Sequence, residues 1–215
     1  MDVRLGDTRI KSIYKGETPI PGIQIGSQLW HGSEGHIISS GVDIGKVWYN
    51  GVTSGNETVV VSSGGKCYNL SVIDNWHYHV SVESGGEVDH TTITSLGHVY
   101  VSSGGRAYNT SLYANGYLYI SNGGIASNAE LIGLSLSCIH VRNGGKLYNA
   151  TARSVEHIVS QWHSNIHVSY GGVASGLIIE SNAQLVISSG GTALAVTSRT
   201  GAEITVSFGG YIEYT

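Results

Sequence analysis

The feature that most constrains this chain is a glycine doublet that returns eight times in its 215 residues. Successive doublets are 19, 21 or 27 residues apart, and 19 is the commonest interval. The first glycines of the doublets are Gly64, Gly85, Gly104, Gly123, Gly144, Gly171, Gly190 and Gly209. Self-similarity at such a period is the signature of repeat architectures, in which each repeat packs mainly on its neighbours.

Two aliphatic columns precede the doublets. Three residues before the first glycine stand Val61, Val82, Val101, Ile120, Val141, Val168, Ile187 and Val206. Five residues before it stand Val59, Val80, Val99, Leu118, Ile139, Ile166, Leu185 and Ile204. A single variable residue separates the columns, which is the period of two that a half-buried β-strand shows. The pattern therefore predicts the same strand in every repeat.

A second strand is predicted after each doublet. Its first inward column holds Cys67, Val88, Ala107, Ala126, Leu147, Ala174, Ala193 and Ile212. Two residues later come Asn69, His90, Asn109, Asn128, Asn149 and Gly176, with Ala195 as the exception. Asn, His and Gly tolerate positive φ, so this column predicts a bend, and stacked Asn side chains could hydrogen-bond along the pile. The chain then continues inward at pairs such as Leu70 and Val72 before turning again.

These columns predict an all-β fold, a parallel β-helix (solenoid) of roughly 19-residue coils. One coil cannot bury its own apolar face, but stacking coils at the strand spacing of about 4.8 Å does so. We expect a right-handed helix, because crossovers between parallel strands are right-handed. Residues 1–30 are predicted to form a small N-terminal β attachment segment, 31–58 a cap or transition, and 59–215 the coils. Cys67 and Cys138 are expected too many coils apart for a disulfide.

Composition excludes several classes of function. The net charge is −4, and charged residues make up only 12% of the chain. No basic field is available for nucleic acid or anionic lipid, and no apolar run reaches the ~20 residues of a membrane helix. The first ten residues carry charges where a signal peptide would be apolar, so we expect no export signal.

The repeated phrase V-S-x-G-G, followed by a short run and Asn, resembles the passenger repeats of AIDA-type autotransporter adhesins from Val59 to the end of the chain. The resemblance implies a β-helical stalk that mediates adhesion to cells or other bacteria, sometimes with sugars on Ser and Thr. It would place those sugars among Ser62, Ser102, Ser121, Ser169, Ser188 and Ser207, which share one position in the repeat.

The N-terminus resembles a different group. Leu5-Gly6-Asp7-Thr8-Arg9-Ile10 returns as Lys15-Gly16-Glu17-Thr18-Pro19-Ile20, which looks like the openings of phage and prophage tail proteins. The resemblance implies attachment to other virion proteins. Paired short strands joined by glycine turns explain the same residues.

The outward positions of the first strand gather aromatic side chains. Seven of them are expected on one face: His79, His98, Tyr100, Tyr117, Tyr119, His140 and His167. Exposed rings can stack on sugar faces while their polar tips bind hydroxyls. Aromatic residues also simply favour sheet surfaces and pair between strands, and a subunit interface would use the same residues.

Two insertions in the repeat add further candidate ligand-binding residues. They carry Trp76 and His77, and Trp162 and His163, at the turn that leads into the first strand. Solenoid insertions are often functional, but each Trp could equally fold back over its turn. Adjacent His residues could share a metal ion, yet no metal-ligand motif appears, so neither a metal site nor a cofactor is predicted.

No catalytic residue is predicted, and the chain is expected not to be an enzyme. Glu83, Glu87 and Asp89 form the one local acidic cluster, and Lys66 and Arg106 in neighbouring coils can pair with it. A glycan-cleaving β-helix would need two matched carboxylates in a groove.

The leading hypothesis is a phage-type structural protein, a tail fibre, tail-associated or surface-decorating solenoid on the virion, that adheres to a host-surface glycan. The alternative is an AIDA-like adhesin passenger at the bacterial cell surface, and a glycan-cleaving enzyme comes third. Because solenoid edges remain open to pairing, a homo-oligomer is expected, with a trimer favoured.

Overall fold

The computed structural model describes residues 58–61, 64–68, 70–73, 79–83, 85–133, 137–154 and 164–215. Between residues 4 and 48 it describes nine short strands, and of these only the backbone. The side chains of 58, 59, 68, 71, 73 and 133 are not described. In these parts of the chain, no helix has both the length and the apolar character needed to cross a membrane.

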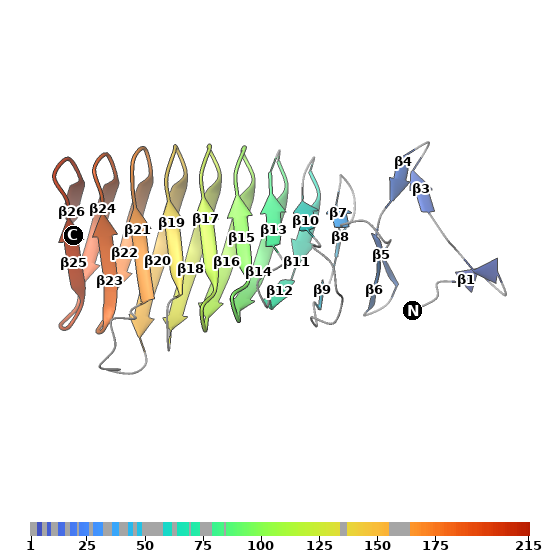
Figure 1. Cartoon of the computed structure of the whole chain (residues 1–215), viewed down its shortest axis with the longest axis horizontal. Helices are drawn as coiled ribbons and strands as arrows, with labels where there is room; N and C mark the ends of the chain where they lie inside the picture. The colour runs from blue at the N-terminus through green and yellow to red at the C-terminus, as the bar shows by residue number, and fades with distance from the viewer. Residues whose placement is uncertain are drawn as a thin grey trace.

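Two long parallel sheets run side by side from β7, β8 and β9 to the C-terminal strands β25 and β26 (Figure 1). The nine-stranded sheet has the order β25-β23-β21-β19-β17-β15-β13-β10-β7. Its strands are β7 (His36–Ile38), β10 (Thr58–Val61), β13 (His79–Val82), β15 (His98–Val101), β17 (Tyr117–Ile120), β19 (Cys138–Val141), β21 (Ser164–Val168), β23 (Ala183–Ile187) and β25 (Glu203–Val206). From β13 onward every second strand along the chain returns to this sheet, and each coil adds one strand to it.

The eleven-stranded sheet takes the other strand of each coil. It comprises β8 (Asp43–Ile44), β9 (Val47–Trp48), β11 (Lys66–Tyr68), β12 (Leu70–Ile73), β14 (Glu87–Thr94), β16 (Arg106–Tyr113), β18 (Ile125–Gly133), β20 (Lys146–Ser154), β22 (Val173–Ile179), β24 (Thr192–Ser198) and β26 (Tyr211–Tyr214). β7, β8 and β9 lie in the segment predicted as a cap or transition, and they pair in parallel with β10, β11 and β12.

Three antiparallel pairs precede the stack. They are β1 (Arg4–Leu5) with β2 (Thr8–Arg9), β3 (Ile13–Lys15) with β4 (Thr18–Ile20), and β5 (Gly22–Ile25) with β6 (Gln28–His31). The predicted strand character of the N-terminal repeat agrees with the first two pairs. Its predicted role in attachment depends on side chains outside the described residues.

The predicted columns are confirmed, and with them the parallel solenoid. Val101, Ile120 and Val141 are register partners on successive strands of the nine-stranded sheet. On the opposite sheet Ala107 lies beside Ala126, and Ala126 beside Leu147. Residues spaced by one repeat therefore occupy equivalent places in successive coils.

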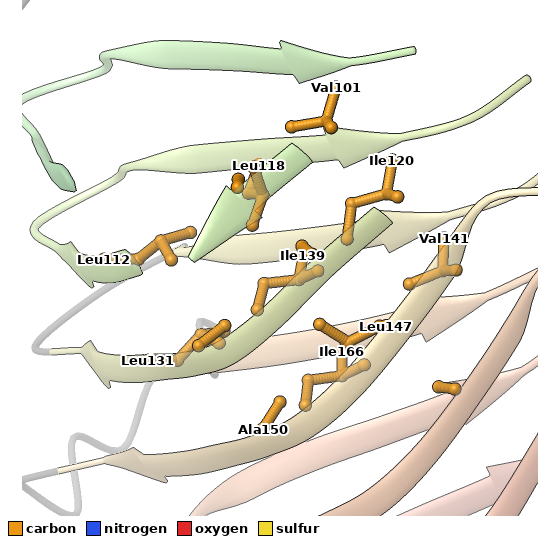
Figure 2. Packing of buried hydrophobic residues seen from close by; sticks show 14 of the residues in the cluster. Val101, Leu112, Leu118, Ile120, Leu131, Ile139, Val141, Leu147, Ala150 and Ile166 are labelled. Carbon is orange, nitrogen blue, oxygen red and sulfur yellow. The ribbon is translucent and has the colours of Figure 1, made fainter. Parts of the chain in front are cut away.

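The core lies between the two sheets (Figure 2). Leu118, Ile139 and Ile166 from the nine-stranded sheet are fully buried, as are Leu112 and Leu131 from the other sheet. β13, β15 and β17 show the alternation of buried and half-buried residues that their sequence predicts. On the edge strand β25 the prediction is wrong for Val206, which is in register with Ile187 but 41% exposed. Burying a leucine-sized side chain contributes about 1.5–3 kcal/mol, so this repeated core stabilises the stack.

The two glycines of a doublet have different roles. Gly123 adopts a φ of +81°, in the left-handed region that favours glycine. Gly124 instead lies against the preceding coil, where a Cβ atom would overlap the carbonyl oxygen of Val101. The doublet thus provides both the turn between the sheets and the close approach of successive coils.

The predicted bend column is also confirmed. Asn109, Asn128 and Asn149 have φ values of +48°, +55° and +52°. Asn128 Nδ2 donates to Asn109 Oδ1 at 3.3 Å, and Asn109 Nδ2 donates to Asp89 Oδ1 at 2.7 Å. Ala195, the exception in sequence, still adopts a φ of +49°. The stack imposes the bend even where the side chain does not favour it.

Both cysteines are free and buried, Cys67 on the eleven-stranded sheet and Cys138 on the nine-stranded sheet. Burial raises the pKa of each thiol to about 12. The right-handed sense of the helix stays a prediction.

Candidate functional site

The seven aromatic and His residues predicted to share a surface do so. They lie on the outward side of β13, β15, β17, β19 and β21, and we call them the ring face: His79, His98, Tyr100, Tyr117, Tyr119, His140 and His167. All seven are half-buried. Because the strands are parallel and in register, the ring face forms two files that run along the solenoid axis.

The longer file is a ladder of four rings from consecutive coils, Tyr100, Tyr119, His140 and His167. The rings of Tyr100 and Tyr119 are stacked, with centroids 4.8 Å apart and planes 11° apart. The rings of Tyr119 and His140 are stacked at 4.9 Å and 3°. His167 follows at 5.7 Å with a tilt of 56°. The centroid distances of the stacked pairs match the strand spacing of about 4.8 Å, so the sheet itself sets the stacking.

The second file consists of His79, His98 and Tyr117. His79 and His98 meet the ladder edge-on, whereas the ring of Tyr117 is nearly parallel to that of Tyr119, with centroids 6.2 Å and planes 12° apart. His79 and Tyr100 are perpendicular at 5.5 Å, and His98 and Tyr119 at 5.9 Å. The Tyr100 hydroxyl lies 3.5 Å from His98 Nδ1. Edge-to-face contacts are a favoured arrangement of aromatic pairs. The expectation that the rings would offer their faces to a ligand is therefore not met at Tyr119, whose neighbours pack on both sides of its ring.

Two central residues of the ring face, Tyr119 and His140, are uncharged near pH 7. Burial, with smaller contributions from His167 and Arg142, lowers the pKa of His140 to about 4. Burial and neighbouring groups, Tyr100 and Cys138 foremost, raise the pKa of Tyr119 to about 12. His140 is thus an uncharged imidazole with one donor and one acceptor nitrogen, and Tyr119 keeps its hydroxyl proton.

A row of serines runs beside the ladder. His167 Nε2 lies 2.8 Å from Ser188 Oγ, one coil further along. Ser188 belongs to the repeat position shared by Ser102, Ser121 and Ser169, which are also half-buried. The sequence aligned these serines with one another but did not place them against the ladder. The spacing in the sequence could have predicted this contact. The serines stand two residues after the ladder position, and residues two apart lie on the same side of a strand.

Cys138 occupies an outward position of β19, in register with Tyr117 and Asn165, yet only 7% of it is exposed. The amide oxygen of Asn165 is likewise buried and has no hydrogen-bond partner within the described residues.

The remaining predicted site residues cannot be placed. Trp76, His77, Trp162 and His163 lie outside the described residues, so their predicted ligand contacts stay a prediction. Among the residues that are described, no group of three or more His, Cys, Asp or Glu side chains could hold a metal ion.

The acidic cluster lies near the doublet that starts at Gly85 and pairs as predicted. Lys66 Nζ lies 3.5 Å from Glu87 Oε1, and Arg106 is the register partner of Glu87 on the other side. Asp89 accepts from Asn109 and lies 3.0 Å from His90 Nδ1. These carboxylates are half-exposed surface groups with cationic or amide partners, an arrangement typical of structural pairing.

Comparison with known proteins supports the fold. No family model matches the chain, and no curated protein matches it. A solved structure, the crystal structure of a TibC-catalysed hyper-glycosylated TibA fragment (55–350), matches with a TM-score of 0.50 and 19% identity, over 84% of this chain and 77% of that chain. At this identity the likeness concerns the fold alone. It supports the resemblance to AIDA-type passenger repeats, and nothing in the comparisons supports the phage-like N-terminus.

Proposed function

We propose that this chain is an adhesion element of the bacterial cell surface, a rigid AIDA-like β-solenoid that binds glycans through the ring face. The observation that carries the proposal is the continuous file of Tyr and His side chains along one sheet. The fold shared with the TibA fragment and the V-S-x-G-G repeat favour this role over that of a phage tail protein.

A binding role is proposed in place of catalysis. Glycoside hydrolysis uses two carboxyl groups about 5–9.5 Å apart across the scissile bond. In the described part of the chain, Glu87 and Asp89 already have surface partners, and β13, β15, β17, β19, β21 and β23 contain no acidic residue. The ring face therefore offers recognition groups but no acid–base pair.

The experiment is a glycan-array measurement on the purified chain. We expect binding that is lost when Tyr100→Ala and Tyr119→Ala are combined. A matched control combines Tyr113→Ala and Tyr148→Ala, two tyrosines that are each 37% exposed on the eleven-stranded sheet. Loss of binding in both double variants, or in neither, would contradict a glycan site on the ring face.

Cellular location needs a separate test. Antibodies raised against the chain should label intact, unpermeabilised bacteria that carry the gene. Labelling confined to purified phage particles would instead restore the virion hypothesis.

The serine row is a proposed acceptor for sugars, by analogy with the hyper-glycosylated TibA fragment. Ser102, Ser121, Ser169 and Ser188 are half-buried and Ser207 is exposed. Co-expression with a glycosyltransferase of the TibC kind should raise the intact mass by whole sugar units, and peptide mapping should locate them at these positions. Sugars found only elsewhere would reject the assignment.

A further inference from the structure

The inner rings of the ladder offer a ligand their edges more than their faces. Tyr119 is stacked between Tyr100 and His140, with ring centroids 4.8 Å and 4.9 Å away. His140 lies between Tyr119, on which it is stacked, and His167, whose ring is tilted by 56°. Both faces of Tyr119 and one face of His140 are therefore covered by rings of neighbouring coils, and the half-buried Tyr119 presents an edge to solvent.

Those edges carry unused hydrogen-bonding groups. Within the described residues, the hydroxyls of Tyr117 and Tyr119 and the ring nitrogens of His140 make no hydrogen bond to another residue. A tyrosine hydroxyl can donate and accept, and a neutral imidazole has one group of each kind. The ladder thus presents a polar ring edge in each of four successive coils, about every 4.8 Å along the axis, and in the coils of Tyr119 and His140 these groups have no partner among the described residues.

The surroundings of the edges favour an uncharged ligand. From β13 to β23 the strands of the nine-stranded sheet contain no Asp, Glu, Lys or Arg. Two charged residues, Glu83 and Arg142, follow β13 and β19 at the repeat position that the serines occupy in other coils, and they have opposite signs. His140 stays neutral because its pKa is lowered to about 4. Apart from these two residues, the strands offer no charged group to an anion or a cation, whereas hydroxyl groups are suitable partners of the ring edges.

We propose that the ring face binds a linear, uncharged polysaccharide that lies along the solenoid axis and is held by hydrogen bonds to ring edges. The axial repeat of the ladder requires a ligand that also repeats its hydroxyl groups along its length, as a polysaccharide does at every sugar unit. The half-buried serine row beside the ladder adds hydroxyls that follow the same axis. This inference rests on the proposed function and specifies the ligand class and the mode of contact.

The deciding variant keeps the rings and removes their hydroxyls. Tyr117→Phe with Tyr119→Phe preserves the stacking while deleting the two hydroxyls that would hydrogen-bond the ligand. We expect affinity to fall about tenfold or more. The control, Tyr113→Phe with Tyr148→Phe on the eleven-stranded sheet, should bind like the parent chain. Both variants should unfold at the same temperature as the parent chain, which shows that a loss of affinity is not caused by misfolding.

The neutral probes are oligosaccharides of β-glucan, galactan and mannan type, and the acidic probe is polygalacturonate. Each is titrated by calorimetry into the full chain, which is produced without a glycosyltransferase. We expect at least one neutral series to bind, with an affinity that rises with chain length and hardly changes between low and high salt. A polyanion held by charge would lose affinity with salt.

The other outcomes overturn the inference in distinguishable ways. If the Tyr→Phe variant binds normally while Tyr100→Ala with Tyr119→Ala does not, the glycan stacks on rings, and only the proposed function survives. Binding restricted to polygalacturonate rejects the neutral ligand class. If no glycan binds, or if the chain self-associates through the ring face instead, both the inference and the proposed glycan site fail.

Discussion

The outer faces of the two long sheets differ although their inner faces are built alike. The strands that carry the ring face have no charged residue, whereas β14, β16, β18 and β20 all do. Ion pairs such as Arg153–Glu130, at 2.7 Å, link neighbouring coils on the charged side. On the neutral side aromatic stacking links them instead.

The difference teaches which part of a coil is free to specialise. Inward residues must fit the coils above and below, so both sheets use aliphatic columns. Outward residues must only pair along the stack, and both charge pairs and ring stacks can do this. A solenoid can therefore carry charged residues on one face and use the other face to bind a ligand.

The largest expected effect comes from the turn that joins the two faces. Gly124→Ala places a Cβ atom on the carbonyl oxygen of Val101, so we expect the free energy of unfolding to fall by about 3 kcal/mol or more. Gly123→Ala has open space and meets only the cost of its left-handed φ, about 1–2 kcal/mol. Urea unfolding followed by circular dichroism compares the two. Equal losses would contradict the close approach of successive coils.

The ladder should also stabilise the stack. Tyr119→Ala removes stacking on both Tyr100 and His140, and we expect a loss of about 2 kcal/mol in the free energy of unfolding. Tyr148→Ala, on the charged face and 37% exposed, should cost less than about 0.5 kcal/mol. If the two variants unfold at the same urea concentration, the rings do not couple the coils.

The neutral face should respond to acid through His140. Its pKa is lowered to about 4 in the folded chain, below the ordinary value of 6.5, so the unfolded chain binds the proton more readily. Stability is therefore retained above pH 6.5 and falls as the pH drops from there toward 4, by about 1 kcal/mol once solvent screening is allowed for. Unfolding measured between pH 7 and 4 should show a shallower decline in His140→Gln. An identical decline in both proteins would reject His140 as the group responsible.

The smallest effect is expected on the charged face. Arg153 and Glu130 are 46% and 41% exposed, and exposed ion pairs contribute about 0–1 kcal/mol. Arg153→Met should lower the melting temperature slightly at low salt and leave it unchanged in 1 M salt, because salt screens the pair. The loss of stability caused by Tyr119→Ala should persist in 1 M salt. This difference would show that charge pairing stabilises one face and ring stacking the other.

Much of the site could be predicted from the sequence because register follows from the repeat. Aligning the doublets placed Tyr100, Tyr119 and His140 in one file, and the structure agrees. Strand alternation also predicted that their side chains point outward. It could not predict the burial of Cys138, since that depends on the size of side chains from the coils on either side.

By itself the sequence determined the parallel stack, the aliphatic columns and the left-handed bends, because each depends on residue type at a fixed place in the repeat. Only the tertiary structure decided what the rings present to solvent. Ring orientation is a matter of side-chain torsions, and those are set by contact with rings 19 to 27 residues away in sequence but one strand away in space.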